Sequence, residues 1–272
     1  MTIAKERIDV LLVEQGYYDS RVKAKAALMA GLVLVDGERI EKSGMKVPRT
    51  ASIVVKGAPH PYVSRGGLKL EKAIKQFGLR LEGAVMLDIG ASTGGFTDCA
   101  LQNGAAYVYA LDVGYNQLDW SLRQDERVNV MERTNFRYTV PEDLKGPRPT
   151  FATIDVSFIS LKLILPTLGT LLGQGAGVVA LIKPQFEAGR EKVGKSGVVR
   201  EPSTHREVLQ QVLGFAAGSG YELKRLTFSP ITGGEGNIEF LAYWQWEPGG
   251  PAAVPDEAAI AALVEEAASA FA

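Results

Sequence analysis

Val85-Met-Leu-Asp-Ile-Gly-Ala-Ser-Thr-Gly-Gly-Phe96 is the stretch that decides the fold of this 272-residue chain. An apolar run ends in an acid, passes through a glycine-rich turn and enters what looks like the start of a helix. Such a turn brings backbone N–H groups and a helix N-terminus close to a ligand. The stretch therefore predicts a site for a nucleotide-like cofactor, but it also fits the G-x-S-x-G turn of serine hydrolases.

Apolar runs and helical patterns alternate from residue 84 onward. Strands are expected over 84–89, 107–112, 128–132, 151–156, 177–183, 222–229 and 237–245, and helices over 65–77, 94–103, 115–123, 161–172 and 203–218. This alternation predicts an α/β fold with a Rossmann-like, doubly wound, mostly parallel sheet of seven strands. We expect this domain over 65–247, after a linker at 59–64 that contains proline, and before a hinge and tail helix at 248–272.

The first 58 residues predict a small α+β domain. A helix that starts near Ile8 ends at Gly16, and Ser20 is placed to cap a second helix up to Ala30. Short strands are expected over 32–35 and 53–55. Residues 1–80 carry 15 Lys and Arg against 8 Asp and Glu, whereas residues 81–272 carry 15 against 23. A basic front end on an acidic body indicates a polyanionic partner.

Cysteine and histidine are too scarce for several classes of site. Cys99 is alone, which excludes an intrachain disulfide and fits a reducing compartment. With one Cys and two His, we expect no metal site. No secretory signal and no apolar run long enough for a bilayer is visible, so we expect a cytoplasmic protein that is not in the membrane.

Two enzyme classes compete for the glycine turn. Ser92, Asp155 and His205 follow the residue order of α/β-hydrolases, but no earlier strand supplies an oxyanion loop and His205 sits in a predicted first helical turn. Asp112 is placed where dinucleotide dehydrogenases bind ribose hydroxyls, yet the turn lacks the G-x-G-x-x-G pattern. An acid two residues before the first glycine, Asp88, instead suits a cationic cofactor such as the sulfonium S-adenosylmethionine. A structural turn without a ligand is the further alternative.

The front end resembles a known RNA-binding module. The blocks Arg7-Ile-Asp-Val-Leu-Leu-Val, Ser20-Arg-Val-Lys-Ala and Gly31-Leu-Val-Leu-Val-Asp-Gly37 are similar to the S4 domain in order and spacing. This resemblance, with the local charge, implies RNA contacts by Arg7, Ser20, Arg21, Lys23, Lys25 and Arg65.

Four distant charged residues carry the second resemblance. Asp155, Lys183 and Glu239 lie in apolar runs, where a charge is costly unless it is paired or functional. With Lys69, they resemble the Lys-Asp-Lys-Glu tetrad of FtsJ-type RNA 2′-O-methyltransferases. The blocks Ser64-Arg-Gly-Gly-Leu-Lys-Leu, Ile154-Asp-Val-Ser-Phe-Ile-Ser and Lys183-Pro-Gln-Phe-Glu-Ala-Gly-Arg are similar to the TlyA/hemolysin A family. That family joins an S4 domain to a class I methyltransferase sheet.

The resemblance implies an S-adenosylmethionine-dependent transfer of methyl to a ribose 2′-hydroxyl of ribosomal RNA or a ribosomal subunit. Lysine is a base only when neutral, and a neighbouring cation and burial favour that state. The resemblance implies Lys183 as this base, with Lys69 as its neighbour and with Asp155 and Glu239 orienting the pair. The implied cofactor residues are Asp88, Gly90, Ala91, Ser92, Thr93, Gly94, Gly95, Phe96, Asp112 and Asn135.

Several alternatives stay open at this point. The methyltransferase fold could be vestigial in a non-catalytic RNA-binding or assembly factor. The hemolysin name suggests membrane lysis, but no suitable amphipathic stretch lies outside the predicted domains. The segment Phe186–Glu201 either closes over cofactor or RNA or is a solvated loop. The modified nucleotide, the ribosomal subunit and the oligomeric state are not predicted.

Overall fold

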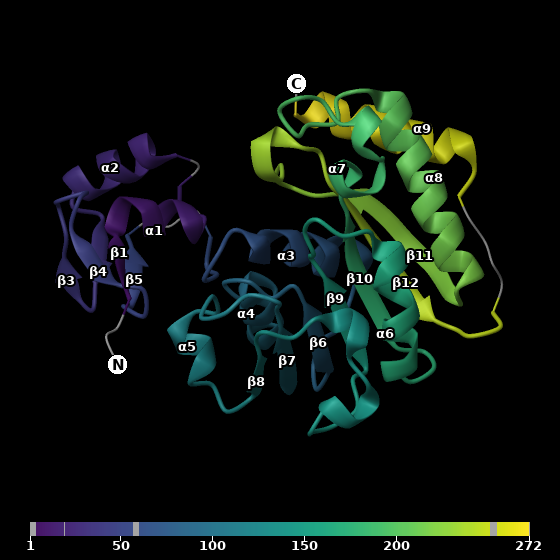
Figure 1. The fold of residues 1–272 in the computed structure, drawn as a ribbon, viewed down its shortest axis with the longest axis horizontal. Helices are drawn as coiled ribbons and strands as arrows, with labels where there is room; N and C mark the ends of the chain where they lie inside the picture. The colour runs from purple at the N-terminus through teal and green to yellow at the C-terminus, as the bar shows by residue number, and fades with distance from the viewer. Residues whose placement is uncertain (1–3, 19, 57–59, 251–254, 272) are drawn as a thin grey trace.

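The seven-stranded sheet organises the larger domain (Figure 1). The structure, a computed structural model, describes residues 4–18, 20–56, 60–250 and 255–271. The strand order is β11-β12-β10-β9-β6-β7-β8, in which β12 runs antiparallel to β11 and β10 and the remaining pairs are parallel. The strands are β6 Val85–Ile89, β7 Tyr107–Leu111, β8 Val128–Met131, β9 Phe151–Ile154, β10 Gly177–Ile182, β11 Tyr221–Phe228 and β12 Phe240–Trp246. The predicted α/β class with a mostly parallel sheet is confirmed.

Helices cover both faces of this sheet. One face packs against α3 (Gly66–Phe77), α4 (Gly95–Gln102) and α5 (Trp120–Arg123), and Cys99 is buried there. The other face packs against α6 (Leu165–Leu171), α8 (Pro202–Gly218) and α9 (Glu257–Ala270). Because side chains alternate along a strand, Met86 enters the first core and Leu87 the second. All six residues of β10 are buried, as expected for a central strand.

Several expected boundaries differ from the structure. The helix expected from residue 115 starts only at Trp120, because the Glu132 carboxylate accepts the N–H groups of residues 116–118 and keeps them in a loop. The helix expected over 161–172 is a 3₁₀ turn, Leu161–Leu163, followed by α6. The last strand starts at Phe240 and not at residue 237, so Glu239 precedes the strand. Asp155 and Lys183 were expected within strands, but they lie directly after the ends of β9 and β10.

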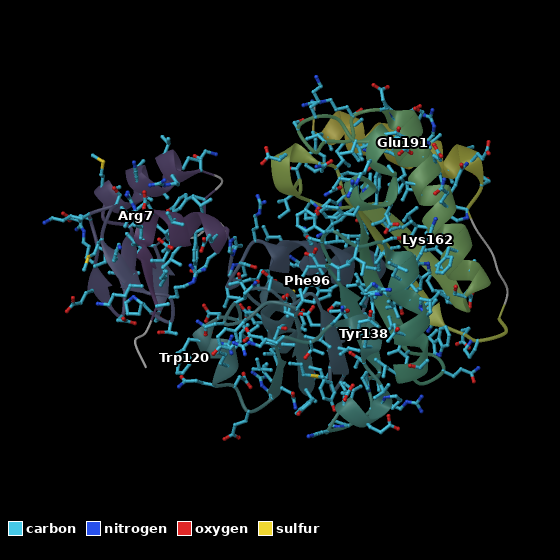
Figure 2. The ribbon with its side chains drawn as sticks, in the orientation of Figure 1. Arg7, Phe96, Trp120, Tyr138, Lys162 and Glu191 are labelled. Atoms are coloured by element: carbon cyan, nitrogen blue, oxygen red, sulfur yellow. The ribbon has the colours of Figure 1, made fainter. Side chains whose placement is uncertain are left out.

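The N-terminal domain has its own apolar core, built by α1 (Ile8–Glu14) and α2 (Arg21–Met29) against two small sheets. The sheets pair β1 (Lys5–Arg7) with β4 (Lys46–Pro48), and β2 (Val33–Val35) with β3 (Glu38–Arg39) and β5 (Ile53–Val55). Ser20 caps α2 as predicted, since its Oγ accepts the N–H of Lys23. Figure 2 shows Arg7 on this domain, well away from Phe96 in the sheet domain.

The tail helix packs on the sheet domain. Ile260, Val264 and Ala267 of α9 are buried in the core shared with α8. Residues 57–59 and 251–254 lie outside the described residues, so the boundaries of the predicted linker and hinge stay predictions. Within the ranges that the structure describes, no helix is long and apolar enough to cross a membrane.

Candidate active site

A cavity of about 950 Å³ opens at the carboxyl ends of the central strands. The glycine turn forms its floor through Gly90, Ala91, Ser92, Thr93, Gly95 and Phe96. Glycine is required at position 90, where φ is +86° and a Cβ would lie 2.5 Å from the Asp155 carbonyl oxygen. The turn therefore runs directly beneath the loop that carries Asp155.

Four of the predicted cofactor residues do not line this cavity. Asp88 lies under the turn, where its carboxylate accepts the hydroxyls of Thr97 (2.7 Å) and Thr153 (2.9 Å). Burial outweighs these bonds and raises the pKa of Asp88 to about 6. Gly94 faces α5, since a Cβ there would lie 2.2 Å from Leu122.

The other two lie near the ends of β7 and β8. Asp112 accepts the N–H groups of Ser92 (2.8 Å) and Gly114 (2.7 Å), which ties the loop after β7 to the glycine turn. Asn135 is exposed, and its side chain accepts the N–H of Arg137. Asp112 therefore supports the turn from the cavity's edge, whereas Asn135 lies outside the cavity.

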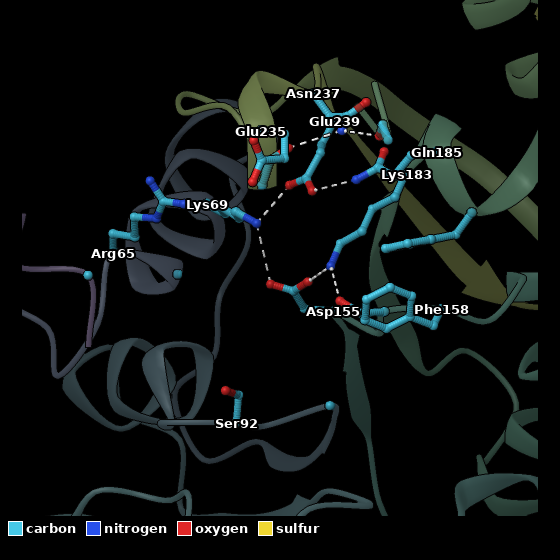
Figure 3. Close-up of a pocket in the computed structure, with 18 of the residues that line it drawn as sticks. Arg65, Lys69, Ser92, Asp155, Phe158, Lys183, Gln185, Glu235, Asn237 and Glu239 are labelled. Atoms are coloured by element: carbon cyan, nitrogen blue, oxygen red, sulfur yellow. Dashed lines mark hydrogen bonds and ion pairs between the residues drawn. The ribbon is translucent and has the colours of Figure 1, made fainter. Parts of the chain in front are cut away.

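The structure brings Lys69, Asp155, Lys183 and Glu239 together in one wall of the cavity (Figure 3). Nζ of Lys69 lies 2.7 Å from Oε2 of Glu239 and 3.5 Å from Oδ2 of Asp155. Nζ of Lys183 lies 2.5 Å from Oδ1 of Asp155. The four groups thus form a chain of alternating charge, in which Asp155 lies between the two lysines.

This chain is stabilised by its own electrostatics. Burial lowers the pKa of Lys69, but the carboxylates of Asp155 and Glu239 outweigh it, and the net direction is upward. Burial raises the pKa of Asp155, but Lys69 and Lys183 reverse the direction, so it is lowered. Both groups are therefore held in their charged forms, as buried charges are when each has a partner.

Two aromatic rings lie beside Lys183, which follows β10 (Figure 3). Phe158 is 90% exposed, lines the cavity and has a φ of +62°. Its ring lies 4.9 Å from that of Phe186, centroid to centroid. A bulky residue with positive φ is strained, and such strain concentrates at functional sites. The sequence analysis missed Phe158, because an apolar run does not show which of its residues a loop turns outward.

Asn237, also missed, connects two loops around the cavity. Its amide donates to the carbonyls of Gly197 and Gly234, and its carbonyl accepts the N–H of Val199 (3.0 Å). The segment Phe186–Glu201 is therefore anchored at its far end, and parts of it line the cavity. Its contact with cofactor or RNA stays a prediction.

The predicted RNA contacts divide between the two domains. Arg65 lines the cavity next to Gly16 of the N-terminal domain. Arg7 and Arg21 both bind Asp9, at 2.9 and 2.8 Å, and the Asp9 side chain is fully buried whereas theirs are about half exposed. Lys23 and Lys25 are exposed on α2, which Ser20 caps. The sequence did not indicate that Asp9, which lies within the S4-like block that starts at Arg7, is the shared partner of the two arginines.

The hydrolase alternative does not fit this geometry. His205 is buried on α8, packs against Phe240 and is not among the residues that line the cavity with Ser92. Among the described residues, no group of three or more His, Cys, Asp or Glu side chains is arranged to hold a metal ion.

Known families match both parts of the chain. Residues 62–246 match the family described as FtsJ-like methyltransferase. The chain belongs to the FtsJ-like methyltransferase family. Residues 6–53 of this methyltransferase match the S4 domain, so the predicted combination is confirmed.

Relatives of this FtsJ-like methyltransferase agree over most of its length. A Bacillus subtilis protein provisionally named rRNA methyltransferase YqxC is 60% identical, over 98% of this chain and 95% of its own. The 16S/23S rRNA (cytidine-2′-O)-methyltransferase TlyA of Mycobacterium tuberculosis is 41% identical, over 88% and 89%. The solved structure of a provisionally named hemolysin from Streptococcus thermophilus superimposes with a TM-score of 0.84 at 52% identity, covering 99% of this chain and 98% of that one.

Proposed function

We propose that this protein transfers the methyl group of S-adenosylmethionine to a ribose 2′-hydroxyl of ribosomal RNA. The observation that carries the proposal is the charge chain Glu239–Lys69–Asp155–Lys183, which shares one cavity with the glycine turn. The names of the relatives and the S4 domain support rRNA as the substrate. An rRNA substrate places the proposed reaction in the cytoplasm.

The residues present suit a nucleoside-containing cofactor. The cavity is large enough for one, since ligand pockets span about 300–1,000 Å³. Gly90 and Gly95 line the cavity and let the turn pack closely against Asp155 and Ser64. Asp112, which holds this turn through the N–H of Ser92, lies just after β7, where an acid can accept ribose hydroxyls. When bound, S-adenosylmethionine supplies an electrophilic methyl group on a sulfonium.

Lys183 is positioned to take the proton of the ribose hydroxyl. Its Nζ is held by Asp155 and by the Ser157 hydroxyl at 3.3 Å, with the cavity in front of it. With the cofactor bound, the ribose oxygen would take the methyl group, with S-adenosylhomocysteine as the leaving group, and Nζ of Lys183 would accept the hydroxyl proton. Lys69 and Glu239 hold Asp155 in place during this step.

The surroundings suit an RNA substrate. The exposed ring of Phe158 is suited to stack on a base next to the reacting ribose. Arg65 at the cavity, and Arg7 and Arg21 on the N-terminal domain, offer guanidinium groups to phosphates. The N-terminal domain thus supplies affinity and placement, while the sheet domain supplies the reaction.

The experiment is methylation of unmodified rRNA with labelled S-adenosylmethionine by the wild type and by Lys183→Ala. Loss of a general base lowers turnover about 10²- to 10⁴-fold, and calorimetric affinity for the cofactor is expected to change little. Lys224→Ala, on β11 and paired with Glu222 away from the cavity, is the matched control. Unchanged turnover of Lys183→Ala would contradict its role as the base.

A further inference from the structure

Two segments lie side by side at the carboxyl edge of the sheet. The first, residues 155–161, follows β9, and the second, residues 183–187, follows β10 and includes α7 (Pro184–Glu187). Lys183 contacts both Asp155 and Ser157, and the rings of Phe158 and Phe186 pack together. A further pair of hydrogen bonds joins the far ends of the segments, and these bonds involve neither the tetrad nor the cavity.

Glu187 makes this outer connection. Its Oε2 accepts the hydroxyl of Ser160 at 2.6 Å, and its Oε1 accepts the N–H of Leu161 at 2.7 Å. It forms no ion pair within 4 Å among the described residues, and burial raises its pKa. The two hydrogen bonds and the nearby charge of Lys162 favour the charged carboxylate and offset part of the cost of its burial.

The effect of the two Glu187 hydrogen bonds follows from the residue that lies between the two anchored ends of segment 155–161. Asp155 is fixed by the lysines at one end of the segment, and Ser160 and Leu161 are fixed by Glu187 at the other. Between them, Phe158 is held in a strained conformation, with φ at +62°. Strain of this kind costs about 1–3 kcal/mol and persists only where the surroundings impose it.

We propose that Glu187 is a positioning residue for the RNA substrate, which fixes the loop 156–160 so that the Phe158 ring stays over the cavity beside Lys183. This inference rests on the proposed function. Glu187 itself does not line the cavity and touches no reacting atom. Without the two hydrogen bonds of Glu187, Phe158 can relax to an unstrained conformation, and its ring no longer stacks on the nucleobase next to the reacting ribose.

The experiment compares Glu187→Ala with Glu187→Gln under saturating S-adenosylmethionine. We expect Glu187→Ala to lower kcat/KM for rRNA about tenfold, which corresponds to about 1.4 kcal/mol, with cofactor affinity unchanged. Glu187→Gln should stay within about twofold of the wild type, because its amide can accept the N–H of Leu161 and donate to Ser160. Ser160→Ala, which removes one of the two bonds, should give a smaller fall and serves if Glu187→Ala does not fold.

A double-mutant cycle separates positioning from general destabilisation. Phe158→Ala should lower kcat/KM in the wild type but add little in Glu187→Ala, because both changes remove the same contact with RNA. Arg148→Met is the matched control, since Arg148 also ties two segments by bonding the Leu172 carbonyl at 2.7 Å, at the opposite edge of the sheet. It should lower the unfolding temperature and leave kcat/KM unchanged.

The possible results are distinguishable. Wild-type kcat/KM in Glu187→Ala, or fully additive losses with Phe158→Ala, would overturn the role of Glu187 while the wild-type activity upholds the proposed function. No methyl transfer by the wild type would overturn both.

Discussion

The buried carboxylate of Asp88 makes the free energy of unfolding of the sheet domain depend on pH. A substitution of Asp88 should remove this part of the pH dependence. Its pKa is raised from 3.8 to about 6, chiefly by burial. A shift of about two pKa units corresponds to about 3 kcal/mol, at about 1.4 kcal/mol a unit. The pKa of Asp88 is higher in the folded state than in the unfolded state. The contribution of Asp88 to the free energy of unfolding is therefore fully present below pH 3.8 and is lost as the pH rises through about 6.

Asp88→Asn is the perturbation that isolates this effect. The amide cannot ionise, so the free energy of unfolding of the variant lacks this pH-dependent loss. Between pH 4 and pH 7, the variant should therefore gain up to about 3 kcal/mol relative to the wild type. Rearranged bonds to Thr97 and Thr153 shift both ends of this comparison equally, so the pH dependence is more informative than the absolute difference.

Urea unfolding at several pH values measures the difference. Trp120, Trp244 and Trp246 all belong to the sheet domain, so tryptophan fluorescence reports its unfolding and not that of the N-terminal domain. The other titrating groups are shared by the two proteins, and their contributions cancel to first order. A difference in unfolding free energy that stays constant from pH 4 to pH 7 would refute the assignment of a raised pKa to Asp88.

Three further changes test separate parts of the molecule. Asp112→Ala removes the acceptor of two backbone N–H groups, and we expect the calorimetric Kd for S-adenosylmethionine to rise at least about tenfold, as hydrogen bonds to charged groups contribute about 1.5–3 kcal/mol. Asp9→Asn removes the charge that orients Arg7 and Arg21, and filter binding should show rRNA affinity weakened by roughly fivefold, about 1 kcal/mol, at unchanged cofactor affinity. Gly90→Ala places a Cβ against the Asp155 carbonyl at positive φ; a loss of about 1–3 kcal/mol in thermal unfolding, together with loss of methyl transfer, is expected.

The strands of the sheet were predictable because burial on both faces leaves nearly continuous apolar runs, as in β10. Strand ends were less predictable. Glu239 lies before β12 because Asn237 bonds to Gly197 and Val199, about 40 residues away in sequence. The short strands β2 and β5 are apolar and were predicted, whereas β1, β3 and β4 together consist mostly of charged residues, so no apolar run marks them.

The residues of the candidate site were also predictable only in part. Asp155 and Lys183 lie together because the parallel strands β9 and β10 end at one edge of the sheet. Glu239 reaches them from just before the antiparallel strand β12 and Lys69 from α3, and the role of the four as a catalytic tetrad stays a prediction. The acids that hold other site residues in place were not predictable, because spacing along the sequence does not show which side chain or backbone group an acid contacts. Asp9 binds Arg21 across a turn, and Glu187 bonds to Ser160 on another loop. Asp88 was expected near a cation, whereas burial places it under the turn with two threonines.

Nucleoside analysis of the methylated product tests the central claim most directly. Unmodified rRNA is incubated with the protein and S-adenosylmethionine, digested to nucleosides and examined by mass spectrometry, with Lys183→Ala in parallel. The account predicts a methyl group on the ribose 2′-oxygen with the wild type and its loss in Lys183→Ala. A methyl group on a base, or no methyl transfer by a wild type that binds both rRNA and cofactor, would contradict it.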